Sequence, residues 1–397
     1  MELIWNLILG IWSFVKMRIL VAYATAGSGH RRAAEALADA ARQRMPEASV
    51  ACVDVLAYCP RWLRWWYPRV YEWLVRATPT LWAVGYYTVD HPWIFRALQL
   101  VRRRWNLLVT ARFLRWVQAF QPDVVLTTHF LPTDVLAAAR RDGRLAAPLT
   151  VVITDLFPHR LWLAREADHF VVGSAWSKQL CEARGIPGER IDVFGIPVGA
   201  RFTRGEDRLQ TLQQVGLDPS RRTLLLASGG MGVGPMAPVA RRLVSLEAQR
   251  PGQLQVIVVC GDNQKLATQL TQEMADAAMP ARILGFVETM PELMRACELL
   301  ITKPGGLTMT EASALGVPMV LYGAIPGQEQ FNAAYAVEHG AAIATRSVEE
   351  MLATVLELLD HPERLHAMRQ RALAMGRPHA ASEIIESVLT RRQDAAS

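Results

Sequence analysis

Three kinds of feature are absent from the sequence, and each absence narrows what the protein can be. The 397-residue chain is 51% hydrophobic, yet it has no uninterrupted run of about 20 apolar residues, so we expect no membrane-spanning helix. Its five cysteines lie far apart without CxxC spacing, which argues against a disulfide framework and against a zinc site. The first residues lack a basic region and a cleavage site, so we expect no secretory signal and a cytoplasmic location. The excess apolar side chains must then be buried or lie against a membrane.

Residues 1–16 allow two interpretations. Their polar and small side chains recur every three or four positions, which would place them on one thin stripe of an interfacial helix. Alternatively, Met17 is the functional start and the preceding residues are of little consequence.

The positive charge is concentrated in one segment. The whole chain carries a formal net charge of +6, whereas residues 61–120 alone hold ten arginines, two acidic residues and eight of the twelve tryptophans. Tryptophan rings settle at headgroup depth and guanidinium groups meet lipid phosphates, so this segment favours an anionic membrane surface. The predicted membrane residues are Trp62, Arg64, Trp65, Trp66, Arg102, Arg103, Arg104 and Trp105.

Arginine patches with stacking rings also bind single-stranded nucleic acid. Here apolar helices, interrupted at Pro68, Pro79 and Pro92, surround the tryptophans. This composition favours lipid, and we expect no nucleic acid partner.

The order of the predicted elements indicates two α/β domains. From Arg18 a buried strand, a glycine turn, a helix and a second strand follow one another, which is a βαβ unit and implies a parallel sheet. A second series of alternating strands and helices begins near Thr223, after a polar stretch rich in turn-forming residues. The predicted units are a first domain over residues 17–200, a linker over 201–222, a second domain over 223–370, and a C-terminal helix with a polar tail over 371–397.

The first glycine turn contains Gly27 and Gly29, but Arg32 stands where a dinucleotide fingerprint needs its third glycine, so evidence for NAD is weak. His30 follows at the start of a helix. The positive end of the helix dipole disfavours the cationic imidazole and leaves a neutral ring that can accept a proton. The alternative is that His30 merely caps the helix.

Two glycine turns in the second half have the form of phosphate sites. Gly229 and Gly230 follow an apolar strand and precede a helix, so their amides can cradle a diphosphate. The loop lacks the GK[ST] ending of a P-loop, which disfavours ATP hydrolysis. The second turn begins at Lys303, and Glu311 lies one helical turn beyond it, where a carboxylate can bind the two hydroxyls of a ribose.

Several motifs together resemble the diacylglycerol glycosyltransferases. They are GSGH, VITDLFPHRLW, DVFGIPV, GFVETM and the long run ITKPGGLTMTEASALGVPMVLYGAIPGQEQFNAAYAVEHGAAI. The resemblance includes both the bacterial processive glucosyltransferases and the plant-type monogalactosyldiacylglycerol synthases, which are related to the lipid-linked N-acetylglucosaminyltransferase of peptidoglycan synthesis. Its most specific part extends from Lys303 to Asn332.

The resemblance implies a GT-B architecture, in which two Rossmann-like doubly wound domains face a central cleft. It places the acceptor and the membrane on the first domain and the UDP-sugar on the second. It also implies an inverting transfer without a metal held by a DxD motif, and the sequence contains no DxD. We therefore expect no metal and no other cofactor.

The site residues follow from the glycine turns and from positions that match the family's motifs. The predicted UDP-sugar residues are Gly229, Gly230, Phe286, Val287, Lys303, Gly305, Gly306, Thr308, Glu311, Gln328, Glu329 and Asn332. The predicted acceptor cleft contains Gly27, Gly29, His129 and His159. The base that deprotonates the acceptor hydroxyl is either His30 or Asp155, and Asp155 has the alternative role of a helix cap.

The predicted activity is transfer of a hexose from UDP-glucose or UDP-galactose to diacylglycerol by a protein bound peripherally to the inner face of the cell membrane. Two alternatives stay open. One is transfer to another lipid, for example of N-acetylglucosamine to a lipid-linked acceptor. The other is a non-catalytic protein that binds a UDP-sugar.

Overall fold

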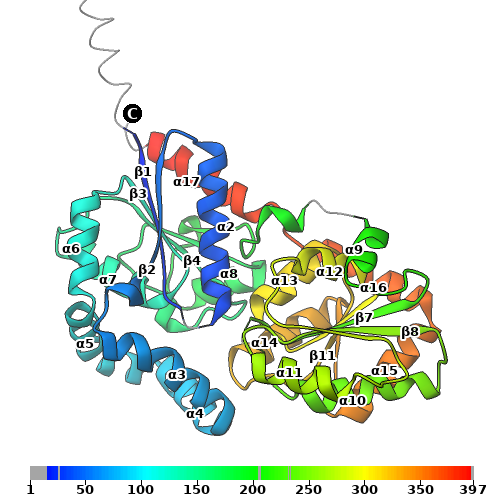
Figure 1. Ribbon diagram of the computed structural model, residues 1–397. Helices are drawn as coiled ribbons and strands as arrows, with labels where there is room; N and C mark the ends of the chain where they lie inside the picture. Colours follow the sequence, from blue (N-terminus) through cyan, green and yellow to red (C-terminus); the bar gives the residue numbers. More distant parts are fainter. Residues whose placement is uncertain (1–15, 26, 204–206, 231, 233, 395–397) are drawn as a thin grey trace, which may run out of the picture.

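The computed structural model describes residues 16–25, 27–203, 207–230, 232 and 234–394. They form two domains, each built on a six-stranded parallel sheet covered by helices (Figure 1). This arrangement confirms the predicted α/β class with two doubly wound sheets. The predicted interfacial segment over residues 1–16 lies outside the described residues, apart from Lys16.

The first sheet has the spatial order β2-β1-β3-β4-β5-β6, and all its neighbouring strands are parallel. Its strands are β1 (Arg18–Tyr23), β2 (Ser49–Asp54), β3 (Val124–Thr127), β4 (Leu149–Val152), β5 (His169–Val172) and β6 (Ile191–Val193). Strands β3, β4 and β5 are buried at every position, as a sheet covered on both faces requires.

The second sheet has the order β12-β11-β10-β7-β8-β9 and is also parallel throughout. Its strands are β7 (Arg222–Ala227), β8 (Leu254–Val259), β9 (Ala281–Leu284), β10 (Leu299–Thr302), β11 (Met319–Leu321) and β12 (Ala342–Ala344).

Each sheet has one place where the chain changes its direction of travel across the strands. In the first sheet β1 lies between β2 and β3, and in the second β7 lies between β8 and β10. Ligands of open parallel sheets bind beyond the carboxyl ends of the strands at such a switch point. The loops after β1 and β3, and those after β7 and β10, are therefore where ligands are expected.

Helices connect the strands and cover the sheets. Those of the first domain are α2 (Ser28–Arg44), α3 (Arg61–Ala77), α4 (Pro79–Asp90), α5 (Pro92–Val109), α6 (Ala111–Phe120), α7 (Phe130–Arg141) and α8 (Ala175–Ala183), with the 3₁₀ turns η1 (Val55–Tyr58), η2 (Arg160–Trp162), η3 (Gly188–Arg190) and η4 (Ala200–Phe202). Those of the second are α9 (Arg208–Gln214), α10 (Met236–Val244), α11 (Gln264–Glu273), α12 (Met290–Ala296), α13 (Gly306–Ala314), α14 (Gln328–Glu338), α15 (Val348–Asp360) and α16 (Pro362–Met375), with the turn η5 (Ser245–Ala248).

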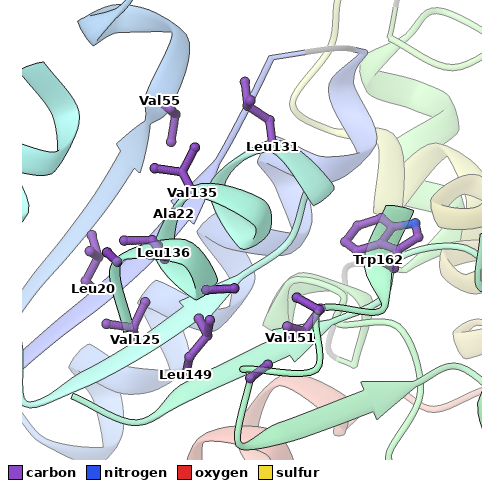
Figure 2. Close-up of a cluster of buried hydrophobic side chains, with 14 of the residues drawn as sticks. Leu20, Ala22, Val55, Val125, Leu131, Val135, Leu136, Leu149, Val151 and Trp162 are labelled. Carbon is purple, nitrogen blue, oxygen red and sulfur yellow. The ribbon is translucent and has the colours of Figure 1, made fainter. Parts of the chain in front are cut away.

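The core of the first domain fixes the loops at its switch point. Figure 2 shows Leu20, Val125 and Leu149 of the sheet beside Val135 and Leu136 of α7, and all five side chains are fully buried. Fully burying one such side chain stabilises the fold by about 1.5–3 kcal/mol. This packing holds β1, β3 and β4 against the helix, so the loops that follow these strands start from fixed positions.

The predicted helix break is wrong at one of the three prolines. Pro79 and Pro92 are the first residues of α4 and α5, where a missing N–H is tolerated because the first helical amides have no partner. Pro68 lies inside α3, and the helix continues through it. Leu63 and Tyr67 on the same helix pack against the domain core, and this packing keeps the helix intact despite the lost hydrogen bond.

The last helix, α17 (Ala380–Asp394), returns from the second domain to the first. Figure 1 shows it beside α2, and its Ile384 and Ile385 are buried in a cluster with Leu37 of that helix. Arg391 also pairs with Asp192 at 2.8 Å. The chain therefore crosses between the domains twice.

Candidate active site

The glycine turns of the two domains approach each other closely. A Cβ added to Gly230, after β7, would lie 2.6 Å from Oγ of Ser28, the first residue of α2. A Cβ on Gly306, the first residue of α13, would lie 2.9 Å from the carbonyl oxygen of Thr154. Glycine permits both approaches, so the two switch points meet and face one shared site. Gly27 precedes α2 with φ of 94°, a conformation that favours glycine.

The neighbours of His30 determine which of its ring nitrogens carries the proton. Its Nδ1 lies 2.9 Å from the carbonyl oxygen of Thr128 and 2.8 Å from Oγ1 of Thr154. A carbonyl oxygen can only accept, so Nδ1 donates and Nε2 keeps a free lone pair. Burial lowers the pKa of His30 to about 4, although the bond to Thr128 acts in the opposite direction. The ring is therefore neutral at pH 7.

His129 is held in the opposite tautomer, with its ring centroid 4.7 Å from that of His30. Its Nδ1 accepts the backbone N–H of Leu131 at 3.0 Å and so caps α7, which leaves the proton on Nε2. Burial lowers the pKa of His129 well below its ordinary value. The side chain is fully buried, and its Nε2 has no hydrogen-bond partner in the part of the chain that the structure describes. An unpaired buried donor costs about 1–3 kcal/mol, so an oxygen of a ligand is its natural partner.

Asp155 lies in the loop after β4, close to the first turn of α13. Burial, with a smaller contribution from the carboxylate of Glu329, raises the pKa of its carboxyl to about 7, while a hydrogen bond from Trp162 acts in the opposite direction. Asp155 does not cap the next helical turn, η2, because His159 does so. A general base works best with a pKa near the working pH, so Asp155 is the better tuned of the two predicted bases.

A cavity of about 450 Å³ opens onto His30, His129 and Asp155. One wall consists of side chains from α3, namely Trp62, Leu63, Trp66, Tyr67, Val70 and Leu74. Gln328, from α14 of the second domain, completes the polar end. The cavity is thus apolar along α3 and also carries acid–base groups, which suits a ligand with a long apolar part and one reactive polar group.

His159 ties the cavity to α4. Its Nε2 donates to the carbonyl oxygen of Tyr86 at 3.0 Å, and its Nδ1 accepts the N–H of Leu161 at 3.1 Å. Both ring nitrogens are therefore used in holding the wall. The residue lines the predicted acceptor cleft and acts there by positioning.

The outer surface of α3, α4 and α5 is strongly apolar. Four of the predicted membrane residues, Trp62, Trp65, Trp66 and Trp105, are 48–54% exposed. Further large apolar side chains are exposed on the same three helices, namely Val70, Trp73, Leu81, Val84, Trp93, Leu98, Leu100, Val101 and Leu108. An exposed apolar patch of this extent is typical of a surface that contacts a membrane or a partner.

Two predicted membrane residues point inward instead. Arg102 lies 3.1 Å from Asp134, and Arg103 lies 3.6 Å from the same buried carboxylate. A buried acid needs a charged partner, so these arginines fasten α5 to α7 and the prediction that they face lipid does not fit their positions. Arg64 and Arg104 are exposed.

The second domain has a smaller pocket at its own switch point. Six of the predicted UDP-sugar residues line it: Gly229, Gly230, Phe286, Val287, Thr308 and Glu311. Burial raises the pKa of the Glu311 carboxyl to about 7, and the guanidinium of Arg32 acts in the opposite direction. Arg32 comes from the first domain, and the sequence showed it only as a departure from a dinucleotide fingerprint.

A second charged pair lies between the glycine turns and the larger cavity. Nζ of Lys303 is 2.5 Å from Oε1 of Glu329, and Oε2 of that carboxylate accepts the N–H of Ile325 at 2.9 Å. Lys303 also approaches the phosphate turn, since a Cβ on Gly229 would lie 3.9 Å from its Cε. Gln328, the neighbour of Glu329 in the chain, lines the cavity, so this pair lies near both the glycine turn and the cavity.

Asn332 connects the two domains. It is fully buried, its Nδ2 donates to the carbonyl oxygen of Pro304 at 3.1 Å, and its Oδ1 accepts the N–H of Leu156 at 3.4 Å. Gly305, in the same loop as Pro304, caps α13. Both polar atoms of the Asn332 side chain are thus hydrogen-bonded, which makes it a positioning residue of the predicted donor site.

Among the residues that the structure describes, no group of three or more His, Cys, Asp or Glu side chains is placed to hold a metal ion. Within the same residues, no helix combines the length and the apolar character needed to cross a bilayer.

The fold and the facing sites define the class of GT-B glycosyltransferases. Residues 30–198 match the family model of monogalactosyldiacylglycerol (MGDG) synthase, and residues 225–384 match the glycosyltransferase family 28 C-terminal domain. The processive diacylglycerol beta-glucosyltransferases of Bacillus subtilis (strain 168) and Bacillus pumilus (strain SAFR-032) are 31% and 30% identical to this chain, over 77% of it and 77% of their own lengths. The chain therefore belongs to the diacylglycerol glycosyltransferase family.

A solved structure supports the fold. MurG of Acinetobacter baumannii superposes with a TM-score of 0.57 at 17% sequence identity, covering 94% of this chain and 99% of that one. The family membership and this likeness confirm the predicted resemblance, the GT-B fold and the prediction that the chain is a glycosyltransferase.

Proposed function

We propose that the protein transfers a hexose from a UDP-sugar to the free hydroxyl of diacylglycerol at a membrane surface. The observation that carries this proposal is the cavity itself. It is lined by the tryptophan-rich helix α3, by His30, His129 and Asp155, and by Gln328 of the second domain. A lipid with one hydroxyl matches both its apolar wall and its polar end.

The donor is assigned to the second domain by the chemistry of its loops. Gly229 and Gly230 offer backbone amides to a diphosphate at the end of a parallel strand. Glu311 can accept hydrogen bonds from a ribose, and Glu329 lies where it can meet the sugar. UDP-glucose is the first choice of donor because the relatives named above are glucosyltransferases, and UDP-galactose is the alternative.

In the proposed reaction, the acceptor oxygen attacks the anomeric carbon while the bond from that carbon to the UDP oxygen breaks. Asp155 takes the hydroxyl proton, and Nε2–H of His129 donates to the acceptor oxygen and orients it. His30, whose pKa of about 4 makes it a much weaker base, is the alternative proton acceptor. UDP leaves with its charge stabilised by Lys303 and by the N-terminus of α13. That no metal takes part remains a prediction.

The same helices suggest how the enzyme reaches its lipid. We propose that the exposed tryptophans of α3 and α5 enter the headgroup region while Arg64 and Arg104 meet anionic lipid. The protein would then be bound peripherally, with the mouth of its cavity at the membrane. Diacylglycerol could pass into the cavity without crossing water.

A transfer assay tests the proposal. The full chain is incubated with anionic liposomes that contain diacylglycerol and, in separate reactions, with UDP-glucose, UDP-galactose or UDP-N-acetylglucosamine. The lipid products are identified by mass spectrometry. We expect hexosyl-diacylglycerol from one or both UDP-hexoses, and none from the Asp155→Asn variant. Transfer of N-acetylglucosamine alone, or no lipid product with any donor, would contradict the proposal.

A further inference from the structure

Arg32 belongs to the first domain, yet its guanidinium lies in the nucleotide pocket of the second. Its Nη1 is 3.4 Å from Oε1 of Glu311, and its Cζ is 5.9 Å from the ring centroid of Phe286. Gly229 and Gly230 line the same pocket. One arginine therefore shares a small space with the carboxylate assigned to the ribose, with the glycines assigned to the diphosphate and with Phe286, another predicted UDP-sugar residue.

The arginine can reach this place only because the domains are in contact. Arg32 lies in the second turn of α2. The first turn of that helix lies against the glycine turn after β7 and against the start of α13. A Cβ on Gly29 would lie 3.7 Å from Cβ of Leu307, and a Cβ on Gly230 would clash with Ser28 as described above. If the domains separated, α2 would carry Arg32 away from Glu311.

Glu311 depends on this arginine. The side chain of Glu311 is 4% exposed, and Arg32 is its one ion-pair partner among the described residues. A buried carboxylate without a partner is strongly disfavoured. The pair uses Oε1 of Glu311, so Oε2 is left to accept a ligand hydroxyl. A guanidinium has five N–H donors, and those not facing Glu311 remain for a second acceptor.

We propose that Arg32 is a nucleotide-binding residue that the acceptor domain supplies across the cleft: it orients Glu311 for the ribose hydroxyls and donates to the diphosphate of the same UDP. This inference rests on the proposed UDP-sugar site. Both interactions exist only while the domains touch, so UDP binds fully only to the closed form. The lipid cavity, which also takes residues from both domains, is complete in that form too.

Calorimetric titration of the full chain with UDP measures the contribution of Arg32. The Arg32→Ala variant should bind UDP at least about tenfold more weakly, because a charge-assisted hydrogen bond is lost. Arg32→Lys should recover part of the affinity, since lysine keeps the charge without the planar fork. Arg31→Ala is the matched control: Arg31 is the adjacent residue of the same helix, pairs at 3.8 Å with the exposed Glu35, and should leave UDP affinity unchanged.

Two further measurements separate a binding role from a purely structural one. Arg32→Ala should weaken UDP binding further in a Glu311→Ala background, because the diphosphate contact does not pass through Glu311. UDP should protect the wild-type chain, but not Arg32→Ala, from limited proteolysis between the domains. Wild-type UDP affinity in Arg32→Ala would overturn the inference and leave the proposed function standing. Failure of the wild-type chain to bind UDP would overturn both.

Discussion

The rings of Phe157 and Phe331 stack across the contact between the two domains, with centroids 4.1 Å apart and planes inclined by 9°. Phe157 follows Asp155 by two residues in the loop after β4. Phe331 follows Glu329 by two residues in the first turn of α14. The stack therefore holds the acid of the acceptor side and the carboxylate of the donor side in a fixed relation.

Replacing Phe331 by alanine should lower the rate of transfer but change the stability of the protein little. A stacked aromatic pair contributes about 0.5–1.5 kcal/mol beyond its buried area, and here that contribution favours domain closure. We expect kcat to fall by roughly tenfold, with little change in the unfolding midpoint of either domain. Phe331→Tyr keeps the ring and serves as the control. Unchanged kcat in Phe331→Ala would show that the stack does not govern closure.

The pH dependence of transfer, measured at saturating UDP-sugar, should distinguish Asp155 from His30 as the base. Only ionised Asp155 can take a proton, and burial raises its pKa to about 7. The ionised fraction falls as pH decreases below that value, so kcat/KM should fall about tenfold per pH unit there and level off above it. The profile is measured with diacylglycerol in mixed micelles. A rate that stays level down to about pH 5 would assign the base to His30, whose pKa is about 4.

His129 should act on the lipid rather than on the nucleotide. His129→Asn keeps a good cap for α7 but removes the Nε2–H that we propose donates to the acceptor oxygen. We expect kcat/KM for diacylglycerol to fall roughly tenfold or more from loss of a hydrogen bond, with KM for the UDP-sugar and the thermal unfolding midpoint nearly unchanged. A rise in KM for the UDP-sugar instead would place His129 on the donor side.

Exposed tryptophans should control attachment to membranes. Trp65 and Trp93 are 50% and 75% exposed, and neither lines the cavity. The double variant Trp65→Ser/Trp93→Ser should float poorly with anionic liposomes, yet should still glycosylate diacylglycerol in detergent micelles. Leu209→Ser, on the exposed side of α9 in the second domain and 49% exposed, is the control and should float as the wild type does. Equal flotation of all three proteins would place membrane contact elsewhere.

Most of the fold could be predicted because its strands are short, mainly apolar runs that alternate with helical segments. The glycine turns and His30 could also be placed, since they follow such strands directly. Pairings between distant residues could not be predicted in this way. Arg32 and Glu311 are 279 residues apart, and no local pattern indicates that they meet.

The basic segment over residues 61–120 shows the same limit of prediction from sequence. Arginines beside tryptophans indicate a membrane surface only when the arginines have no acidic partner within the protein. Arg102 and Arg103 instead pair with Asp134, which lies on α7 and carries no signal in the sequence that it is buried. The return of α17 to the first domain likewise could not be predicted, because its apolar residues such as Ile384 could pack on either sheet.

We propose that the lipid acceptor occupies the cavity beside α3, and photo-crosslinking can locate it. Liposomes that contain diacylglycerol with a diazirine on its acyl chain are mixed with the full chain and UDP. The mixture is irradiated, and the labelled peptides are mapped. We predict labels on the α3 wall, at Leu63, Tyr67, Val70 or Leu74, and their loss when unlabelled diacylglycerol competes. Competable labelling confined to other surfaces, with this wall unmodified, would contradict the placement of the lipid in this cavity.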